Sequence, residues 1–217
     1  SLLDRWARLI FHLPYAFHGK RIFMEIFMLE KQRHDTWNAF AKAHELVVPK
    51  ATDFEDEAAY QKAYAKFLKA ISKTDEYRAL VSEKLEKAQR ASSEIGNMYA
   101  CSIFLALMST FEADWQEDSE LVGQQFGFFG YGSGSKSKVF EAEVQPQWKE
   151  VVANFQLTQK LDNRQALDYP TYEKLHRKRL SESVLAPQDE FALAAVGTEG
   201  VTLGARYYQF VPAKVNV

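Results

Sequence analysis

Cysteine, long apolar runs and an excess of positive charge are all scarce in this sequence. Its 217 residues include one cysteine, Cys101, so no intramolecular disulfide can form, which fits a reducing cytoplasm. No apolar run reaches about 18 residues, so we expect no membrane span, and no signal peptide is visible. Lys and Arg number 27 against 29 Asp and Glu, for a net charge of −2. This balance does not favour nucleic-acid binding, although a phosphorylated ligand needs only a local basic patch.

The composition is that of a folded chain. Hydrophobic residues make up 47% and aromatic residues 14%, which is enough to bury a core in one large domain or two small ones. The sequence opens at Ser1 without an initiator Met, and strand-like sequence follows within a few residues. We therefore expect a piece of a longer protein, and a trimmed chain is the alternative.

Strand and helix patterns mix along the whole chain, which predicts an α/β or α+β fold. Period-two and short apolar segments predict strands, and helical spacing predicts helices. The expected strands cover residues 7–13, 126–129, 138–144, 191–196 and 201–211, and the last two form a hairpin. The expected helices cover 20–33, 55–73, 74–92, 97–115, 148–157 and 170–179. The pair over about 54–92 is expected to be a helical insertion on the outside, with its charges on a solvated face.

The segment 97–115 is the strongest helix prediction. A wide apolar stripe runs along it, formed by Ile103, Phe104, Leu107, Met108, Phe111 and Trp115. Cys101 lies among these apolar residues with no basic partner nearby, so we expect a buried, inert thiol.

His12 is the first candidate for chemistry. It ends an apolar strand just before Pro14, and strand ends at turns are where α/β folds place reactive side chains. A histidine there can donate to a substrate carbonyl or move a proton near neutral pH. A histidine at the edge of the core, bonded to backbone, is the alternative.

Asn97 and a glycine-rich segment are the next candidates. An Asn amide is a neutral donor that can hold a carbonyl oxygen as it gains charge, although Asn97 can equally cap the helix that it opens. Residues 129–135 read Phe-Gly-Tyr-Gly-Ser-Gly-Ser, and such glycines let the backbone approach a ligand closely. A tight β-turn is the alternative for this segment. His34, His44 and His176 lack the spacing of metal ligands, so no metal is assigned.

Taken together, these segments resemble the hydroxymethylglutaryl-CoA synthase family of the thiolase superfamily. Three motifs occur in the family's order: Phe-His-Leu-Pro-Tyr at 11–15 with Gly-Lys at 19–20, Gly-Asn-Met-Tyr at 96–99, and Tyr-Gly-Ser-Gly at 131–134. The likeness covers most of residues 10–138. It implies the C-terminal half of a duplicated thiolase-like fold.

The resemblance also implies roles for particular residues. His12 would hold the acetoacetyl carbonyl and act as the catalytic proton donor, and Asn97 would hydrogen-bond the acetoacetyl group. Ser133 and Tyr131 would line the acyl pocket beside Pro14. Lys20 would lie near the phosphates or pantetheine of coenzyme A.

The sequence departs from the family in ways that bear on function. Phe17 stands where a lysine is common, and Ala100 and Cys101 replace the usual residues after Tyr99. The acylated cysteine and the glutamate base of the family belong to an N-terminal half that is missing here. A thiolate and a base are both needed for an acyl-enzyme condensation, so we expect this chain to be inactive alone.

The resemblance therefore implies a cytoplasmic condensing enzyme of the mevalonate pathway to isoprenoids. The intact reaction would join acetyl-CoA, acetoacetyl-CoA and water into hydroxymethylglutaryl-CoA and CoA, with coenzyme A thioesters as substrates and no permanently bound cofactor. Expected partners are the missing N-terminal half and a second copy in a homodimer, with no nucleic acid and no membrane. One alternative is a relative that acts on an acyl carrier protein and makes a β-branch. A non-catalytic thiolase-fold partner is another.

Overall fold

The computed structural model describes residues 1–132, 134–180 and 182–213. The chain divides into two units, residues 1–164 and 165–217. The first unit contains α1 (Leu2–Arg5), β1 (Trp6–Phe11), α2 (His18–Arg33), α3 (Trp37–Ala43), η1 (Ala51–Asp53), α4 (Glu57–Ile71), α5 (Asp75–Lys84), α6 (Glu86–Ile95), η2 (Tyr99–Cys101), α7 (Ser102–Gln116), β2 (Gln125–Gly132), β3 (Lys136–Glu143), α8 (Trp148–Val152) and α9 (Leu157–Asp162). The second contains α10 (Tyr169–His176), β4 (Glu190–Val196), η3 (Gly200–Thr202) and β5 (Arg206–Val211).

The first unit is built on a mixed sheet with strand order β1-β2-β3. β1 runs parallel to β2, with Phe11 opposite Phe129, and β2 pairs antiparallel with β3. Parallel neighbours need a long crossover, and the helices α2 to α7 supply it. The mixed class predicted from the sequence is confirmed.

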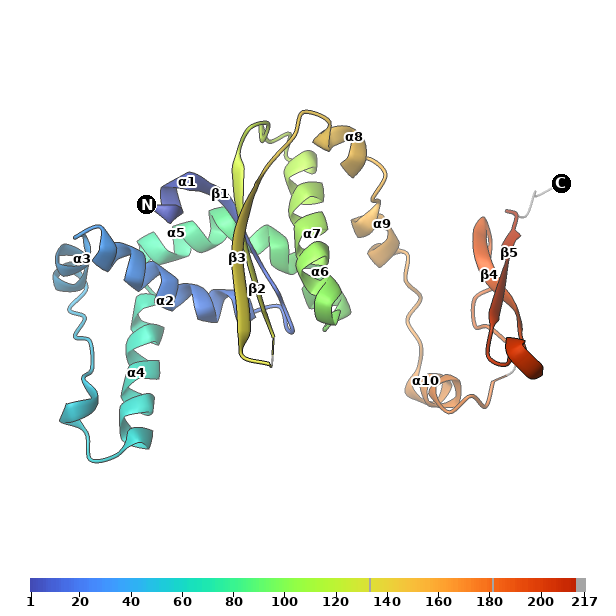
Figure 1. Ribbon diagram of the computed structural model, residues 1–217, viewed down its shortest axis with the longest axis horizontal. Helices are drawn as coiled ribbons and strands as arrows, with labels where there is room; N and C mark the ends of the chain where they lie inside the picture. Colours follow the sequence, from blue (N-terminus) through green and yellow to red (C-terminus); the bar gives the residue numbers. More distant parts are fainter. Residues whose placement is uncertain (133, 181, 214–217) are drawn as a thin grey trace. The chain divides into compact units, whose positions relative to one another are not determined.

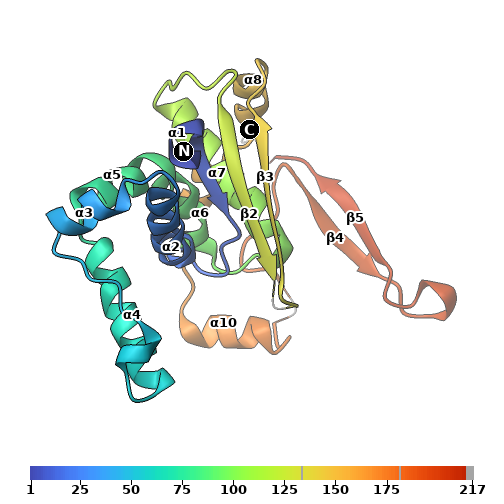
Figure 2. The same ribbon diagram turned by 60° about the vertical axis from the view of Figure 1, so that its left-hand side comes forward.

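Each face of this sheet carries aromatic side chains that meet a different set of helices. Phe11 stacks on Phe129 at 4.4 Å between ring centroids, and Gly19 of α2 packs against Phe11. On the opposite face, Phe126 lies 5.3 Å from Phe111 of α7. The sheet therefore stands between α2 and α5 on one side and α6 and α7 on the other (Figures 1 and 2).

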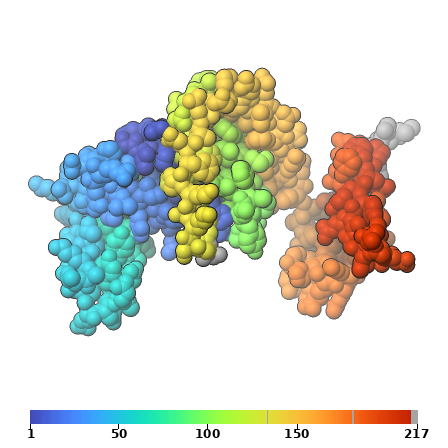
Figure 3. Space-filling model, viewed as in Figure 1, coloured from blue at the N-terminus to red at the C-terminus, as the bar shows by residue number. Residues whose placement is uncertain are grey.

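β3 is the outer strand of the sheet, and its residues are exposed along its whole length. They lie on the surface that faces the viewer in Figure 3, in yellow. Val139 and Phe140 are large apolar side chains among them. The core therefore lies under β1 and β2.

The buried face of α7 differs from the predicted apolar stripe. Leu105, Ala106, Ser109 and Ala113 are buried, whereas Phe104 is exposed. Small side chains allow α6 to approach α7 closely, and the backbone N–H of Ala91 donates to Ser109 Oγ at 3.2 Å. α7 is therefore packed on two sides: its small residues lie against α6, while Ile103, Leu107 and Phe111 of the predicted stripe are partly buried against the hydrophobic core.

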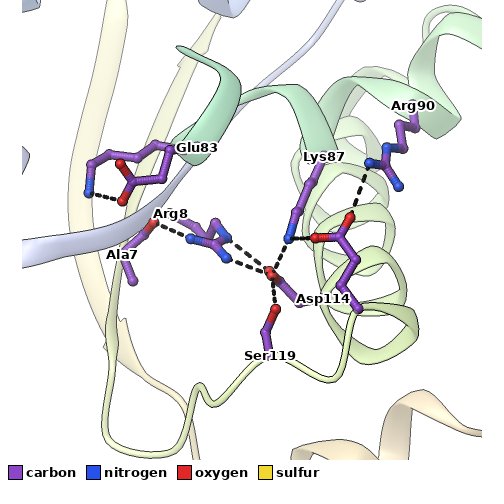
Figure 4. A network of polar contacts seen from close by, with 9 residues as sticks. Ala7, Arg8, Glu83, Lys87, Arg90, Asp114 and Ser119 are labelled. Carbon is purple, nitrogen blue, oxygen red and sulfur yellow. Dashed lines mark hydrogen bonds and ion pairs between the residues drawn. The ribbon is translucent and has the colours of Figure 1, made fainter. Parts of the chain in front are cut away.

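A buried cluster of charges joins β1, α6 and α7 (Figure 4). Asp114 is completely buried and accepts hydrogen bonds from Arg8 Nη2 at 2.6 Å, from Lys87 Nζ at 2.5 Å and from Ser119 Oγ at 2.9 Å. Burial alone raises the pKa of Asp114, but the hydrogen bonds from Arg8 and Lys87 outweigh it and lower this pKa. Asp114 therefore links β1 and α6 to α7 through its bonds to Arg8 and Lys87.

The prediction that the charges of residues 74–92 form a solvated face is confirmed for side chains such as Asp75, Arg78 and Glu83, which are exposed, but two lysines depart from it. Lys87 reaches inward to Asp114, and the buried Lys84 donates to the backbone oxygen of Trp6 at 2.9 Å. The predicted single helix is also two, α5 and α6, broken at Leu85. Whether residues 54–92 form an insertion stays a prediction.

Two further predictions are wrong near the start of α7. The helix begins at Ser102 rather than Asn97, because Gly96 and Tyr99 adopt left-handed φ values of 86° and 50°. Cys101 is exposed, since it lies in the short turn η2 before the helix. The segment predicted as one helix over 148–157 likewise forms α8 and then α9.

The second unit contains the predicted helix, now α10, and the predicted hairpin of β4 and β5. The predicted second strand over 201–211 is too long, because residues 200–202 form η3 and β5 begins at Arg206. Asp168 caps α10 by accepting the N–H of Thr171 at 2.8 Å. None of the described residues between 165 and 213 is buried, and Phe191, Leu193 and Phe210 are among the exposed side chains. This unit has no core of its own. In the described ranges, no helix has the length and apolar character needed to cross a membrane.

Candidate functional site

His12 lies directly after β1, as the sequence predicts. Its backbone N–H donates to the oxygen of Phe129 at 2.9 Å, which extends the β1–β2 pairing by one residue. Pro14 follows in a bend that leads into α2, because proline has no N–H to continue the ladder. The side chain of His12 is half-buried at this end of the sheet.

Ser102, the first residue of α7, holds the His12 ring. Its hydroxyl contacts His12 Nδ1 and also accepts the backbone N–H of Leu13 at 3.0 Å. Ser102 is completely buried. The sequence alone does not reveal Ser102, because nothing in the local pattern shows that position 102 meets position 12 in the folded chain. The order of the motifs at 11–15 and 96–99 was the one sequence feature that suggested a shared site.

Tyr131, at the end of β2, holds the backbone of His12 from another side. Its hydroxyl donates to the oxygen of His12 at 2.5 Å, and its ring lies edge-on to the His12 ring at 5.1 Å. Burial raises the pKa of Tyr131, so its hydroxyl stays protonated. The structure thus brings together two of the predicted residues.

His18, the first residue of α2, is a second histidine at this place that the sequence analysis did not single out. Its ring lies 5.4 Å from that of Tyr131 and 4.9 Å from that of Tyr15. Burial lowers the pKa of His12. Burial, the charge of Arg21 and the charge of His12 lower the pKa of His18. Both rings are therefore neutral at pH 7, and a neutral ring donates from one nitrogen and accepts at the other.

Asn97 lies in the exposed loop between α6 and η2. Its Oδ1 accepts the N–H of Tyr99 at 2.7 Å, so it does not cap α7. This bond fixes the orientation of the amide and directs its oxygen to the backbone. No contact between Asn97 and His12 is found in the parts of the chain that the structure describes. Ser133 lies outside the described residues.

Lys20 belongs to a different place on α2. Its Nζ donates to Glu86 Oε1 of α6 at 2.9 Å, and this bond lowers the pKa of Glu86. The two line a cavity of about 530 Å³ together with Arg21 and Arg78. Three cationic side chains therefore line the cavity, and the apolar side chain of Met24 also lines it.

No group of His, Cys, Asp and Glu side chains suited to a metal ion is found among residues 1–132, 134–180 and 182–213. The chemistry that this end of the sheet can support is hydrogen bonding and proton transfer. Its histidine rings and hydroxyl groups are the kinds of group that polarise a carbonyl.

Solved structures with similar folds define the class of the chain. A structure entitled MvaS in complex with 3-hydroxy-3-methylglutaryl coenzyme A matches 96% of this chain and 42% of its own, with a TM-score of 0.63 and 19% identity. PksG, an HMG-CoA synthase from Bacillus subtilis, matches 97% of this chain and 44% of its own, with a TM-score of 0.58 and 18% identity. At these identities the likeness shows the fold, which is the mixed α/β fold of the thiolase-like class.

The family model "Hydroxymethylglutaryl-coenzyme A synthase C terminal" matches residues 1–192. The chain therefore belongs to the hydroxymethylglutaryl-CoA synthase family, and the resemblance read from its motifs is confirmed.

Curated relatives give the same family. Hydroxymethylglutaryl-CoA synthase of Haloferax volcanii is 25% identical over 169 residues, which cover 75% of this chain and 37% of the relative. Hydroxymethylglutaryl-CoA synthase A of Dictyostelium discoideum is 24% identical over 219 residues, which cover 95% of this chain and 42% of the relative. The chain thus spans less than half the length of these relatives.

Proposed function

We propose that this chain is the C-terminal half of an enzyme that condenses acetyl-CoA with acetoacetyl-CoA and water, giving hydroxymethylglutaryl-CoA and CoA. The observation that carries the proposal is His12, held by Ser102 and Tyr131 at the end of β1 in a chain of this family. We assign His12 the role of donor to the carbonyl oxygen that gains negative charge.

The proposed chemistry is an aldol-type addition. A base removes a proton from the methyl group of an enzyme-bound acetyl thioester, and the resulting carbon attacks the ketone carbon of the acceptor. The ketone π electrons move to oxygen, where the ring N–H of His12 hydrogen-bonds the developing alkoxide. The alkoxide takes up a proton in place of the one that the base removed, and water then cleaves the acyl-enzyme thioester. The acyl-carrying cysteine and the base belong to the N-terminal half in this proposal. Preorganised donors lower the cost of the alkoxide.

The other predicted residues keep supporting roles in the proposal. Asn97 offers its amide hydrogens to the acceptor, because its oxygen is held by Tyr99. Tyr131, Pro14 and Ser133 border the acyl group. Lys20 acts with Arg21 and Arg78 around the cationic cavity, which suits the phosphates of a coenzyme A thioester.

The second candidate is an acceptor bound to an acyl carrier protein. This is the alternative that the sequence left open, a relative that makes a β-branch. Phe17 is exposed and stands where the family often has a lysine, so one cation that would attract CoA is absent. The curacin biosynthetic pathway HMG synthase, solved in complex with holo donor-ACP, matches 97% of this chain with a TM-score of 0.59. Its 17% identity supports only a shared fold.

The acceptor class can be tested with this chain joined to its N-terminal half, on one polypeptide or two. Acetyl donor would be supplied with acetoacetyl-CoA or with an acetoacetyl carrier protein, and hydroxymethylglutaryl thioester followed by mass spectrometry. Turnover of the CoA substrate supports the first proposal. Turnover only on the carrier replaces it with the second, and no turnover on either favours a non-catalytic thiolase-fold partner.

We also propose a homodimer as the working assembly. The exposed apolar side chains on β3 and on the β4–β5 hairpin are consistent with surfaces that are covered in the assembled enzyme. Sedimentation of the joined halves, giving twice the mass of one complete unit, is the expected result. A single unit at micromolar concentration would contradict it.

A further inference from the structure

The contact between Ser102 and His12 fixes the position of the ring and also bears on which ring nitrogen carries the proton. Ser102 Oγ already accepts the N–H of Leu13 at 3.0 Å, so one lone pair of its oxygen is used. The hydroxyl still carries its own hydrogen. Ser102 is completely buried, so this hydrogen cannot be satisfied by bulk water.

Within the described part of the chain, His12 Nδ1 is the acceptor found for that hydrogen. A neutral imidazole has one protonated nitrogen and one that accepts. If Nδ1 carried the proton, two hydrogens would meet between Oγ and Nδ1, or the serine hydroxyl would turn away and stay unpaired. A buried donor without a partner is unfavourable.

We infer that Ser102 is a positioning residue that holds His12 in the tautomer with the proton on Nε2. The relay runs from the Leu13 N–H to Ser102 Oγ and from the Ser102 hydroxyl to Nδ1. Nε2–H is then the ring's donor. The catalytic meaning rests on the proposed function, because the Nε2–H is the group that would serve the acceptor carbonyl.

The groups around the ring support a neutral His12. Tyr131 packs edge-on against it and gives its hydroxyl hydrogen to the backbone, and the His18 ring lies 5.4 Å from that of Tyr131. A protonated ring would offer a second N–H to Oγ and displace the serine hydrogen. Burial acts in the same direction by lowering the pKa of His12.

The tautomer can be measured by long-range proton–nitrogen NMR on the ¹⁵N-labelled chain at pH 8. Among the signals of the five histidines, those of His12 are identified because they are the set that is lost in a His12→Asn variant. We expect a single Nε2–H form for His12, with the Nδ1 shift in the acceptor range. An Nδ1–H form, or a fast average of both, overturns the inference. This reading needs no catalysis, so its failure and that of the proposed function are distinguishable.

Ser102→Ala tests the cause. We expect loss of the single tautomer in this variant and its return in Ser102→Thr, which restores a hydroxyl. Ser109→Ala is the matched control, because Ser109 is also buried on α7, accepts a backbone N–H and donates to a backbone oxygen, and does not contact His12. An unchanged tautomer in Ser102→Ala overturns the inference. If that variant does not fold, the tautomer of the unmodified chain still decides.

Discussion

Among single residues, Asp114 is a buried carboxylate whose charge is balanced by two cationic side chains. It receives Arg8 and Lys87, both largely buried, and it is itself shielded from water. Breaking a buried ion pair by removing one partner leaves a charge without compensation, which costs about 3–5 kcal/mol. We expect Asp114→Ala to lower the free energy of unfolding by that amount in urea denaturation.

Asp118→Ala is the control for this prediction. Asp118 is exposed and pairs with Lys149 at 2.8 Å, and an ion pair in full contact with water contributes little to stability. Equal losses in the two variants would contradict the view that burial makes the Asp114 cluster important.

His12 and His18 predict how stability depends on pH. The folded state lowers the pKa of both rings, so the unfolded chain binds protons on them at higher pH than the folded chain. Their contribution is present above the unfolded value of about 6.5 and is lost as pH falls through the folded values. Urea unfolding between about pH 5 and pH 8 should show a smaller pH slope for the variant with His12→Gln and His18→Gln. Identical slopes would count against the shifts.

Among the elements, β2 depends on a glycine that the sequence analysis passed over. A Cβ on Gly127 would lie 2.3 Å from the ring of Trp6, which Glu141 holds through a hydrogen bond to the indole N–H at 2.9 Å. Overpacking of this kind costs about 1–3 kcal/mol, and we expect Gly127→Ala to lose it in chemical unfolding. Gly130→Ala on the same strand is the control, since its nearest neighbour would be 3.9 Å away. Equal stability of the two variants would refute the close packing.

The elements also show how far the sequence reaches. β1, α2, α4 and the β2–β3 pair were predicted because their apolar periodicity is local. The start of α7 was not, because left-handed residues such as Tyr99 depend on the loop around them. The apolar stripe of α7 was predicted in part, since Ile103, Leu107 and Phe111 pack against the core, whereas the buried face of small residues depends on the close approach of α6. His12, Tyr131 and Lys20 were predicted from motifs and their roles stay predictions, while the contacts of Ser102 and His18 required the three-dimensional arrangement.

At the scale of the whole molecule, the second unit is the part that we expect a partner surface to stabilise. Its hairpin exposes large apolar side chains, and an isolated two-stranded hairpin is marginal in water. We expect amides of β4 and β5 to exchange with solvent deuterium much faster than those of β1 and α7 in the separate chain. Addition of the N-terminal half should slow them if that half covers the hairpin. Equal protection of β4 and β1 in the separate chain would contradict this account.

The most direct test of the proposed function is the rate of condensation by the joined halves with His12→Ala. Removing one hydrogen-bond donor to a developing oxyanion costs about 10²–10³-fold in kcat, so we predict a loss in that range with the fold retained. The control is His44→Ala, because His44 is exposed just after α3 and contacts Phe40 rather than the site. Condensation that continues at the unmodified rate without the His12 ring would contradict the central role given to this residue.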